Sequence, residues 1–300
     1  MKPTTLKTAF LTTRPAFLLL TPICIFLGLS ISLGQQVDIS LTIALLIIIG
    51  AMCAHISVNM LNEYYDFKSG LDLDTDKTAF SGGSGALPNH PEAANVVLSI
   101  GIVSLCITIL IGFYFIAVRG SQILPIGLIG ALLVVTYTQW VNRLPLLCLI
   151  APGLGFGVLM VVGTHTVIAG APSSLAWLIS LIPFFLINNL LLLNQYPDIQ
   201  ADANNGRRTF PIVYGVRASN MVYAIFLISC FGLMIASIVN GTLPRLSVIA
   251  ICPIILALYA LSGAIKHADQ IGRHPQYLAA NVATALLTPL LLAIAITYGQ

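Results

Sequence analysis

Amide and carboxylate side chains recur at helical spacing in two windows of this 300-residue sequence. In the first window Asn59, Asn62 and Asp66 stand at positions i, i+3 and i+7, so a helix would carry all three on one face. The same window contains four more carboxylates: Glu63, Asp72, Asp74 and Asp76. Oxygen atoms gathered in this way are the ligands that hard cations such as Mg²⁺ prefer.

The second window repeats the pattern every four residues, with Asn194, Asp198 and Asp202. These three share a face if a helix continues through Pro197, and they do not if the proline kinks the chain. Polar side chains of this kind at the end of an apolar helix are costly unless they meet partners or water. We therefore expect the two windows to face each other across one polar pocket.

Two arginines, Arg207 and Arg208, directly follow the second window. Guanidinium groups bind phosphate oxygens in pairs, and Mg²⁺ in proteins is held by carboxylates together with substrate phosphates. Carboxylates for a metal beside arginines for phosphate predict a site for a diphosphate leaving group. A charged loop is more often a solvated surface, but two matching clusters argue against that interpretation.

The elements that must carry these windows are apolar segments long enough to cross a membrane. The chain is 58% hydrophobic and only 8% charged, whereas soluble domains carry about 25% charged residues. The candidate spans are residues 15–34, 41–64, 95–118, 122–140, 146–169, 174–195, 217–239, 246–265 and 278–298. The sequence thus predicts an all-α membrane protein, a bundle of nine transmembrane helices in which residues 1–300 form a single polytopic membrane domain.

Basic residues divide unevenly between the two faces of such a bundle. One face holds Lys2, Lys7, Arg14, Lys68, Lys77, Arg143, Arg207, Arg208, Arg217, Lys266 and Arg273, and the other holds Arg119 and Arg245. The positive-inside rule then places the N-terminus in the cytoplasm and the C-terminus outside, in a multi-pass protein of the cell inner or plasma membrane. Both polar windows follow even-numbered spans, which predicts a cavity that faces the cytoplasm. The basic residues form no long run, so no nucleic-acid partner is expected.

The motifs within these windows resemble those of the UbiA superfamily of intramembrane aromatic prenyltransferases. The more specific is the second motif, Asp198-x3-Asp202-x3-Gly206-Arg207-Arg208-Thr209, with Gly215 beyond it. The first motif, Asn59-x2-Asn62-Glu63-x2-Asp66 with Gly70 and Asp72, is most similar to the 1,4-dihydroxy-2-naphthoate prenyltransferase branch. Glu63 stands where the first motif commonly has Asp. The tract from Phe80 to Pro88 also fits this branch.

The resemblance implies a role for each matching position. The implied metal ligands, which would hold two Mg²⁺ ions, are Asn62, Asp66, Asp72, Asp198 and Asp202. The residues implied to meet the diphosphate are Asn62, Lys68, Arg143, Asn194, Arg207 and Arg208. The implied catalytic residues are Asp66, Asp198, Asp202 and Tyr137, whose ring would lie near the reacting allylic carbon.

The predicted function is Mg²⁺-dependent transfer of a polyprenyl group from an isoprenoid diphosphate to a lipophilic aromatic acceptor, within membrane lipid. The branch resemblance favours quinone biosynthesis of the menaquinone kind. Other acceptors remain open: 4-hydroxybenzoate, homogentisate, a porphyrin or chlorin, and a glyceryl phosphate lipid. A secondary transporter is the alternative of another class, but transporters bind substrate near the bilayer midplane rather than at one face. A non-catalytic scaffold would need neither motif.

Overall fold

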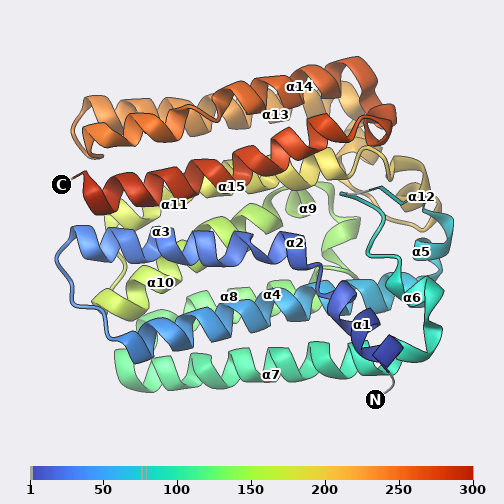
Figure 1. The fold of residues 1–300 in the computed structure, drawn as a ribbon, viewed down its shortest axis with the longest axis horizontal. Coiled ribbons are helices and arrows are strands. Elements are labelled where there is room, and N and C mark those ends of the chain that lie inside the picture. The colour runs from blue at the N-terminus through green and yellow to red at the C-terminus, as the bar shows by residue number, and fades with distance from the viewer. Residues whose placement is uncertain (1–2, 76, 79, 300) are drawn as a thin grey trace.

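The computed structural model describes residues 3–75, 77–78 and 80–299, and these residues form a helical bundle (Figure 1). Lys2 and Asp76 lie outside the described residues. Eight helical segments are long and apolar enough to cross a membrane, and a shorter apolar segment, Ser121–Thr136, stands where the fourth span was predicted. The predicted all-α membrane fold is confirmed, with a fourth span that is shorter than the others.

The helices follow one another with short connections. Those that build the spans are α2 (Pro15–Leu18), α3 (Leu20–Gly34), α4 (Leu41–Ser69), α7 (Ala94–Arg119), α8 (Leu124–Thr136), α9 (Pro145–Pro152), α10 (Met160–Ala169), α11 (Ser174–Asn194), α13 (Phe210–Val239), α14 (Ile254–His267) and α15 (Pro275–Tyr298). The short helices are α1 (Pro3–Thr12), α5 (Leu71–Asp74), α6 (Ala86–Asn89) and α12 (Ile199–Asn204).

Local sequence signals set the ends of the helices that carry the two windows. α4 continues five residues beyond its predicted end and stops at Gly70, whose φ of 88° suits glycine. α11 starts after Ser173, whose hydroxyl accepts a hydrogen bond from the Ala176 amide at 3.1 Å. α11 ends at Asn194, three residues before Pro197. The chain therefore leaves the helix before the second window is complete.

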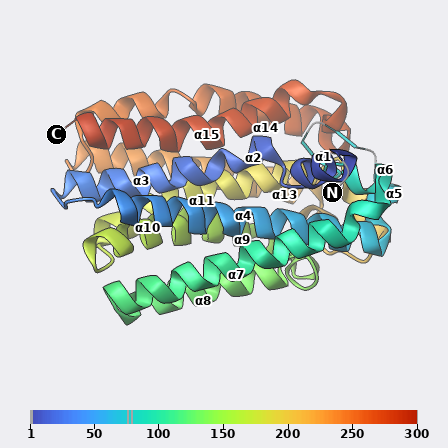
Figure 2. The same ribbon diagram turned by 60° about the horizontal axis from the view of Figure 1, so that its bottom comes forward.

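The core is centred on α11, where Ile179, Ile182 and Leu186 are each 1% exposed. A π-helix, Gly153–Leu159, joins α9 to α10 and packs against α11. A Cβ at Gly153 would lie 2.3 Å from the Phe184 carbonyl oxygen, so only glycine permits this approach. The tight contact holds this span against α11, whereas α7 and α8 lie together along one edge of the bundle (Figure 2).

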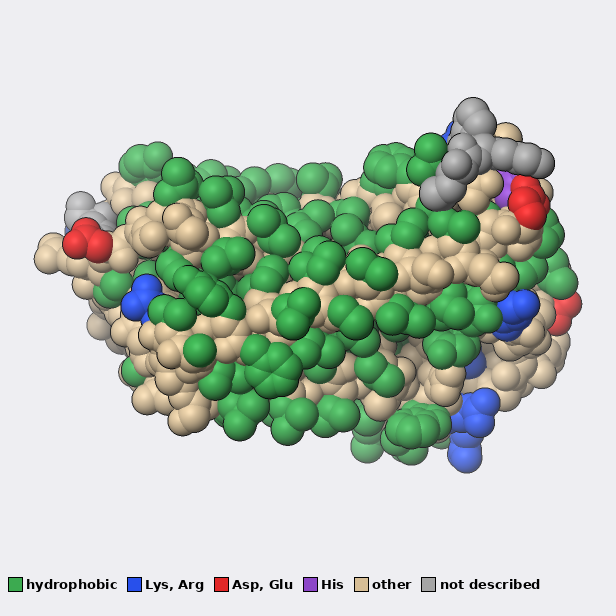
Figure 3. Space-filling view, turned by 90° about the horizontal axis from the view of Figure 1, so that it is seen from below, with side chains coloured by type: hydrophobic (Ala, Val, Ile, Leu, Met, Phe, Trp, Pro, Cys, Tyr) green, Lys and Arg blue, Asp and Glu red, His purple; other side chains and the backbone are tan. Residues whose placement is uncertain are grey.

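The outer surface matches a lipid-facing bundle. On the face that Figure 3 shows, apolar side chains cover the belt between the two ends, and charged side chains lie mainly near the ends. α1, α5, α6 and α12 lie at the end that holds the N-terminus, and the C-terminus lies at the opposite end (Figure 1). Both polar windows therefore open at the same membrane face as the N-terminus.

Candidate active site

The two windows meet at the polar end of a cavity of about 600 Å³. The predicted site residues that line it are Asn62, Asp66, Asp72, Tyr137, Asn194, Asp198, Asp202 and Arg207. The side chains of Lys68, Arg143 and Arg208 are exposed and do not line the cavity. The structure thus brings together eight of the predicted residues and places three basic residues outside.

The first window is built on the last turns of α4. Asn62 and Asp66 lie one helical turn apart and both face the cavity. The Asn62 amide donates a hydrogen bond to the Thr138 hydroxyl at 3.3 Å. After α4 the left-handed backbone of Gly70 redirects the chain into α5, and this turn brings Asp72 to the cavity as well.

The second window is divided between two helices. Asn194 is the last residue of α11, and Asp198 immediately precedes α12, which carries Asp202. These side chains therefore do not share the face of one continuous helix, which was one of the two predicted outcomes. A turn gathers them instead, and Gly206, with φ of 77°, folds Arg207 back towards Asp202.

Arg207 links the two windows. Its Nη1 donates to Asp202 Oδ1 at 2.9 Å, and its Nη2 pairs with Asp66 Oδ1 on α4. Burial would lower the pKa of the Arg207 guanidinium, but Asp66 and Asp202 outweigh that effect and raise it. The site thus contains a permanently charged cation between two carboxylates that lie far apart in the sequence.

Two carboxyl groups at the site are poised to change charge near neutral pH. Burial, and then the neighbouring carboxylates Glu63 and Asp66, raise the pKa of Asp72 to about 7. Burial, and then Asp202, raise the pKa of Asp198 to about 7. A cation bound among these groups would oppose both shifts, because a nearby positive charge favours the ionised form of a carboxyl group.

Several buried oxygen atoms at the cavity have no hydrogen-bond partner within the part of the chain that the structure describes. They are Asp72 Oδ2, Asp198 Oδ1, Asn194 Oδ1 and Gln195 Oε1. Buried polar atoms are normally paired, so unpaired oxygens on residues that line a cavity fit a site that would bind a cation. An all-oxygen set is the type that Mg²⁺ binds. Among the described residues no three His, Cys, Asp or Glu side chains are grouped as ligands of one ion, and Arg207 stands between Asp66 and Asp202.

The rest of the cavity is mostly apolar and follows α4 into the bundle. Ile47, Gly50, Ala54 and Val58 of α4 line it. From Ile47 to Asp66 the helix rises by about 28 Å, close to the hydrocarbon thickness of about 30 Å. The cavity therefore combines a polar mouth with an apolar interior that is long enough for an extended hydrocarbon chain.

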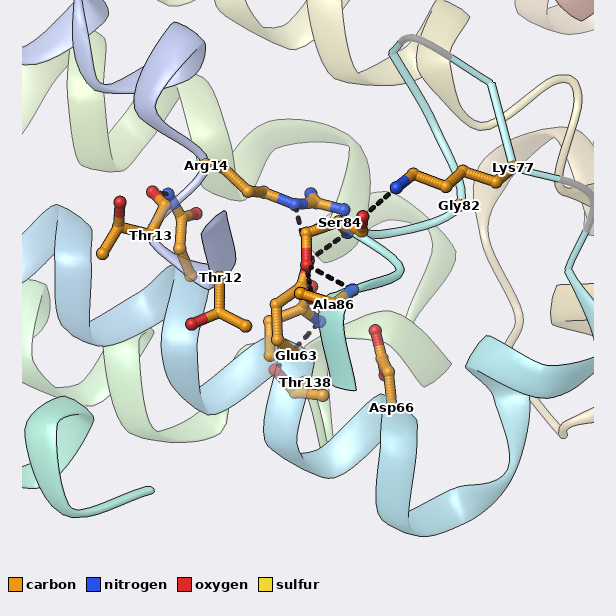
Figure 4. Close-up of polar contacts among 12 residues, drawn as sticks. Thr12, Thr13, Arg14, Glu63, Asp66, Lys77, Gly82, Ser84, Ala86 and Thr138 are labelled. Carbon is orange, nitrogen blue, oxygen red and sulfur yellow. Dashed lines mark hydrogen bonds and ion pairs between the residues drawn. The ribbon is translucent and has the colours of Figure 1, made fainter. Parts of the chain in front are cut away.

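Sequence reasoning missed two features of the mouth. Arg14 lines the cavity and pairs with Glu63, which lies 49 positions later in the sequence (Figure 4). Ser81 and Gly82 line the cavity from the segment between α5 and α6. One signal was present: a carboxylate at Glu63, buried at the end of an apolar helix, requires a cationic partner.

Comparison with known families gives a match over most of the chain. The family model described as the UbiA prenyltransferase family matches residues 21–277. The 1,4-dihydroxy-2-naphthoate octaprenyltransferase of Bacillus subtilis (strain 168) is 28% identical over 235 residues, which cover 76% of this chain and 73% of that protein. The digeranylgeranylglyceryl phosphate synthase of Thermococcus sibiricus (strain DSM 12597 / MM 739) is 25% identical over 245 residues, covering 77% and 74%.

A solved structure shares the fold. A UbiA homologue from Archaeoglobus fulgidus, bound to DMAPP and Mg²⁺, superposes with a TM-score of 0.65 at 16% identity. The alignment covers 97% of this chain and 99% of that one. The likeness establishes a common arrangement of helices along the whole chain.

Proposed function

The chain belongs to the UbiA prenyltransferase family, and we propose that it transfers a polyprenyl group from an isoprenoid diphosphate to an aromatic acceptor with the help of Mg²⁺. Family membership makes the protein a multi-pass membrane prenyltransferase, as the motifs predicted. The observation that carries the finer proposal is the cavity itself. Its mouth joins two carboxylate windows through Arg207, and its interior is apolar.

The mouth suits a diphosphate held with metal ions. We assign the metal to Asn62, Asp66, Asp72, Asp198 and Asp202, and we propose two ions. The unpaired oxygens of Asp72 and Asp198 support this assignment, and so does the related protein bound to DMAPP and Mg²⁺. When bound, Mg²⁺ would neutralise charge on the departing diphosphate.

Arg207 contributes a second, fixed positive charge at the mouth. It is oriented by two carboxylates before substrate arrives, so it can stabilise the leaving diphosphate without reorganising. Asn62 and Asn194 would orient the diphosphate from opposite windows. We propose that the exposed Lys68, Arg143 and Arg208 attract the anionic donor to the mouth, since surface charges act on association.

The apolar interior would hold the polyprenyl chain and keep water from the allylic cation. Tyr137, which lines the cavity after α8, is placed to present its ring to that cation, an interaction of about 0.5–2 kcal/mol. The aromatic ring of the acceptor then attacks the allylic carbon as the bond to diphosphate breaks. The ring proton leaves to a mouth carboxylate or to the released diphosphate.

We propose a dihydroxynaphthoate-like acceptor and a role in quinone biosynthesis. The first motif and the Bacillus subtilis relative support this choice. A glyceryl phosphate lipid is the second candidate, because a digeranylgeranylglyceryl phosphate synthase is similar over a comparable length. A transporter is disfavoured, since α5 and α12, which carry Asp72 and Asp202, lie at one end of the bundle (Figure 1). We propose that this face is cytoplasmic and that residues 1–300 act as one membrane domain.

The test is transfer of a radiolabelled prenyl group by the purified protein in detergent. The donors are dimethylallyl, geranylgeranyl and longer diphosphates, and the acceptors include dihydroxynaphthoate and a glyceryl phosphate lipid, with Mg²⁺ or EDTA. We expect product with dihydroxynaphthoate. This product should be lost in EDTA and in the Asp66→Asn variant, and it should be retained in Asp269→Asn, the control at an exposed residue. Product with the glyceryl phosphate lipid and not with dihydroxynaphthoate would make that lipid the acceptor. The absence of product with every acceptor would overturn the proposal.

A further inference from the structure

A glycine-rich segment crosses the mouth of the cavity. We define the strap as residues 80–85, between α5 and α6. Gly82, Gly83 and Gly85 have φ values of 77°, 69° and 66°, which side-chain-bearing residues rarely adopt. The first four strap residues line the cavity. This backbone is therefore part of the wall around the proposed diphosphate position.

Glu63 holds the strap to α4. Glu63 is 1% exposed, and its carboxylate accepts three hydrogen bonds (Figure 4). The Ser84 amide and hydroxyl each donate to it at 2.6 Å, to Oε1 and Oε2 respectively. Arg14 Nε donates to Oε1 at 3.0 Å. Both carboxylate oxygens are thus engaged by the strap, and the guanidinium neutralises the buried charge.

The other side of the strap contacts the second window. The Gly82 amide donates to Asp198 Oδ2 at 3.1 Å. A Cβ at Gly83 would lie 3.0 Å from Asp72 Oδ1 and 3.4 Å from Glu63 Oε1, so the strap backbone also packs closely against the first window. A continuous series of contacts therefore runs from Arg14 through Glu63 and Ser84 to Asp198.

We infer that Glu63 is a positioning residue, not a metal ligand, which fixes the strap so that the Gly82 amide orients Asp198 at the cavity mouth. This inference rests on the proposed function, because it assigns Asp198 to the metal. One oxygen of Asp198 is held by the strap and the other, Oδ1, is left without a partner among the described residues. Such an arrangement fixes one oxygen of Asp198 and leaves the other, buried beside the cavity, available to a ligand.

The reach of the side chain explains why Glu63 suits this role. Glu63 meets the amide and hydroxyl of the same residue, with one oxygen for each. An aspartate would be shorter by one carbon–carbon bond, about 1.5 Å, which exceeds the tolerance of hydrogen bonds of this length. Glu63→Asp should therefore behave like loss of the contact.

Hydrogen exchange measured by mass spectrometry tests the strap directly, without substrate. In Glu63→Gln and Glu63→Asp, amide exchange in the peptide that covers residues 80–86 is expected to be on the order of tenfold faster than in the wild type. Ser84→Ala should show the same change, and Ser84→Thr, which keeps the hydroxyl, should not. Glu92→Gln, an exposed acid at the same end of the bundle, is the matched control. Unchanged exchange in both Glu63 variants would overturn the inference.

A second readout separates positioning from metal ligation. Loosening Asp198 should raise the Mg²⁺ concentration for half-maximal transfer by about tenfold in Glu63→Gln, with kcat at saturating Mg²⁺ within about twofold of wild type. If Glu63→Gln instead lost kcat as completely as Asp198→Asn does, at every Mg²⁺ concentration, Glu63 would be a metal ligand and the positioning role would be refuted. If the wild type transfers no prenyl group, the proposed function fails, and the exchange result still decides whether Glu63 holds the strap.

Discussion

Metal binding by this protein should depend steeply on pH. Asp72 and Asp198 each have a pKa raised to about 7, and a carboxyl group must lose its proton before it binds a metal. Each group is then about one-tenth ionised at about pH 6 and about nine-tenths ionised at about pH 8. If Mg²⁺ requires both carboxylates, its apparent affinity rises on the order of 100-fold over that interval.

Calorimetric titration of Mg²⁺ into the detergent-solubilised protein, without donor, measures this dependence. Buffers with different ionisation enthalpies count the protons released, which should approach two at the lower pH. Asp198→Asn removes one titrating group and should reduce the change to about tenfold, whereas the exposed control Asp269→Asn should match the wild type. A Mg²⁺ affinity that is constant over this pH range, or an Asp198→Asn variant that retains the full change, would refute the reasoning.

Three further outcomes follow from burial and packing. Folding raises the pKa of Asp72 and of Asp198, so the metal-free protein should lose stability as pH rises from about 4 through about 7. Melting curves should show this loss, and added Mg²⁺ should reverse it. A melting temperature of the metal-free protein that rises with pH would contradict the prediction. Arg207→Gln leaves two buried carboxylates without their cation and should lower the free energy of unfolding by about 3–5 kcal/mol in EDTA, and by less in Mg²⁺, as denaturant titration would reveal. Gly153→Ala forces a Cβ against the Phe184 carbonyl oxygen and should cost about 1–3 kcal/mol, whereas Gly232→Ala, which has open space, should not; equal stability of the two variants would contradict the packing argument.

The membrane spans were predictable because length and apolarity are physical requirements of a helix in lipid. The end of α4 was not, because hydropathy ceases to mark the helix where polar residues begin at the membrane face. Asn62 and Asp66 continue the helix there, and only Gly70 ends it. The spacing of residues in the sequence could not predict how the side chains of the second window come together. The helix stops at Asn194, and a turn places Asp198 and Asp202.

The sequence predicted a residue of the mouth correctly only where the local helix or turn places that side chain at the cavity. Arg208 and Arg143 stand next in sequence to Arg207 and Asn142, which line the cavity, yet their own side chains are exposed. Adjacent positions in a turn point in different directions, so a motif match does not decide which of two neighbours faces the substrate. Arg14 was missed for a different reason, because its pairing with the first window depends on how the N-terminal helices fold back over α4.

The charges at the mouth explain why metal and donor should bind together. Among the described residues there, the buried or half-buried acids are Glu63, Asp66, Asp72, Asp198 and Asp202. The corresponding cations are Arg14 and Arg207. The ionised acids outnumber the cations even when Asp72 and Asp198 carry protons, so the mouth keeps a net negative charge. A diphosphate that arrived without a metal ion would be repelled by this charge, and repulsion is strong in a partly desolvated site. A divalent cation would remove that repulsion and displace the protons, and a bound diphosphate would in turn supply further oxygen ligands. Each ligand thereby raises the affinity for the other, and the mouth should select the metal complex of the donor over the free diphosphate.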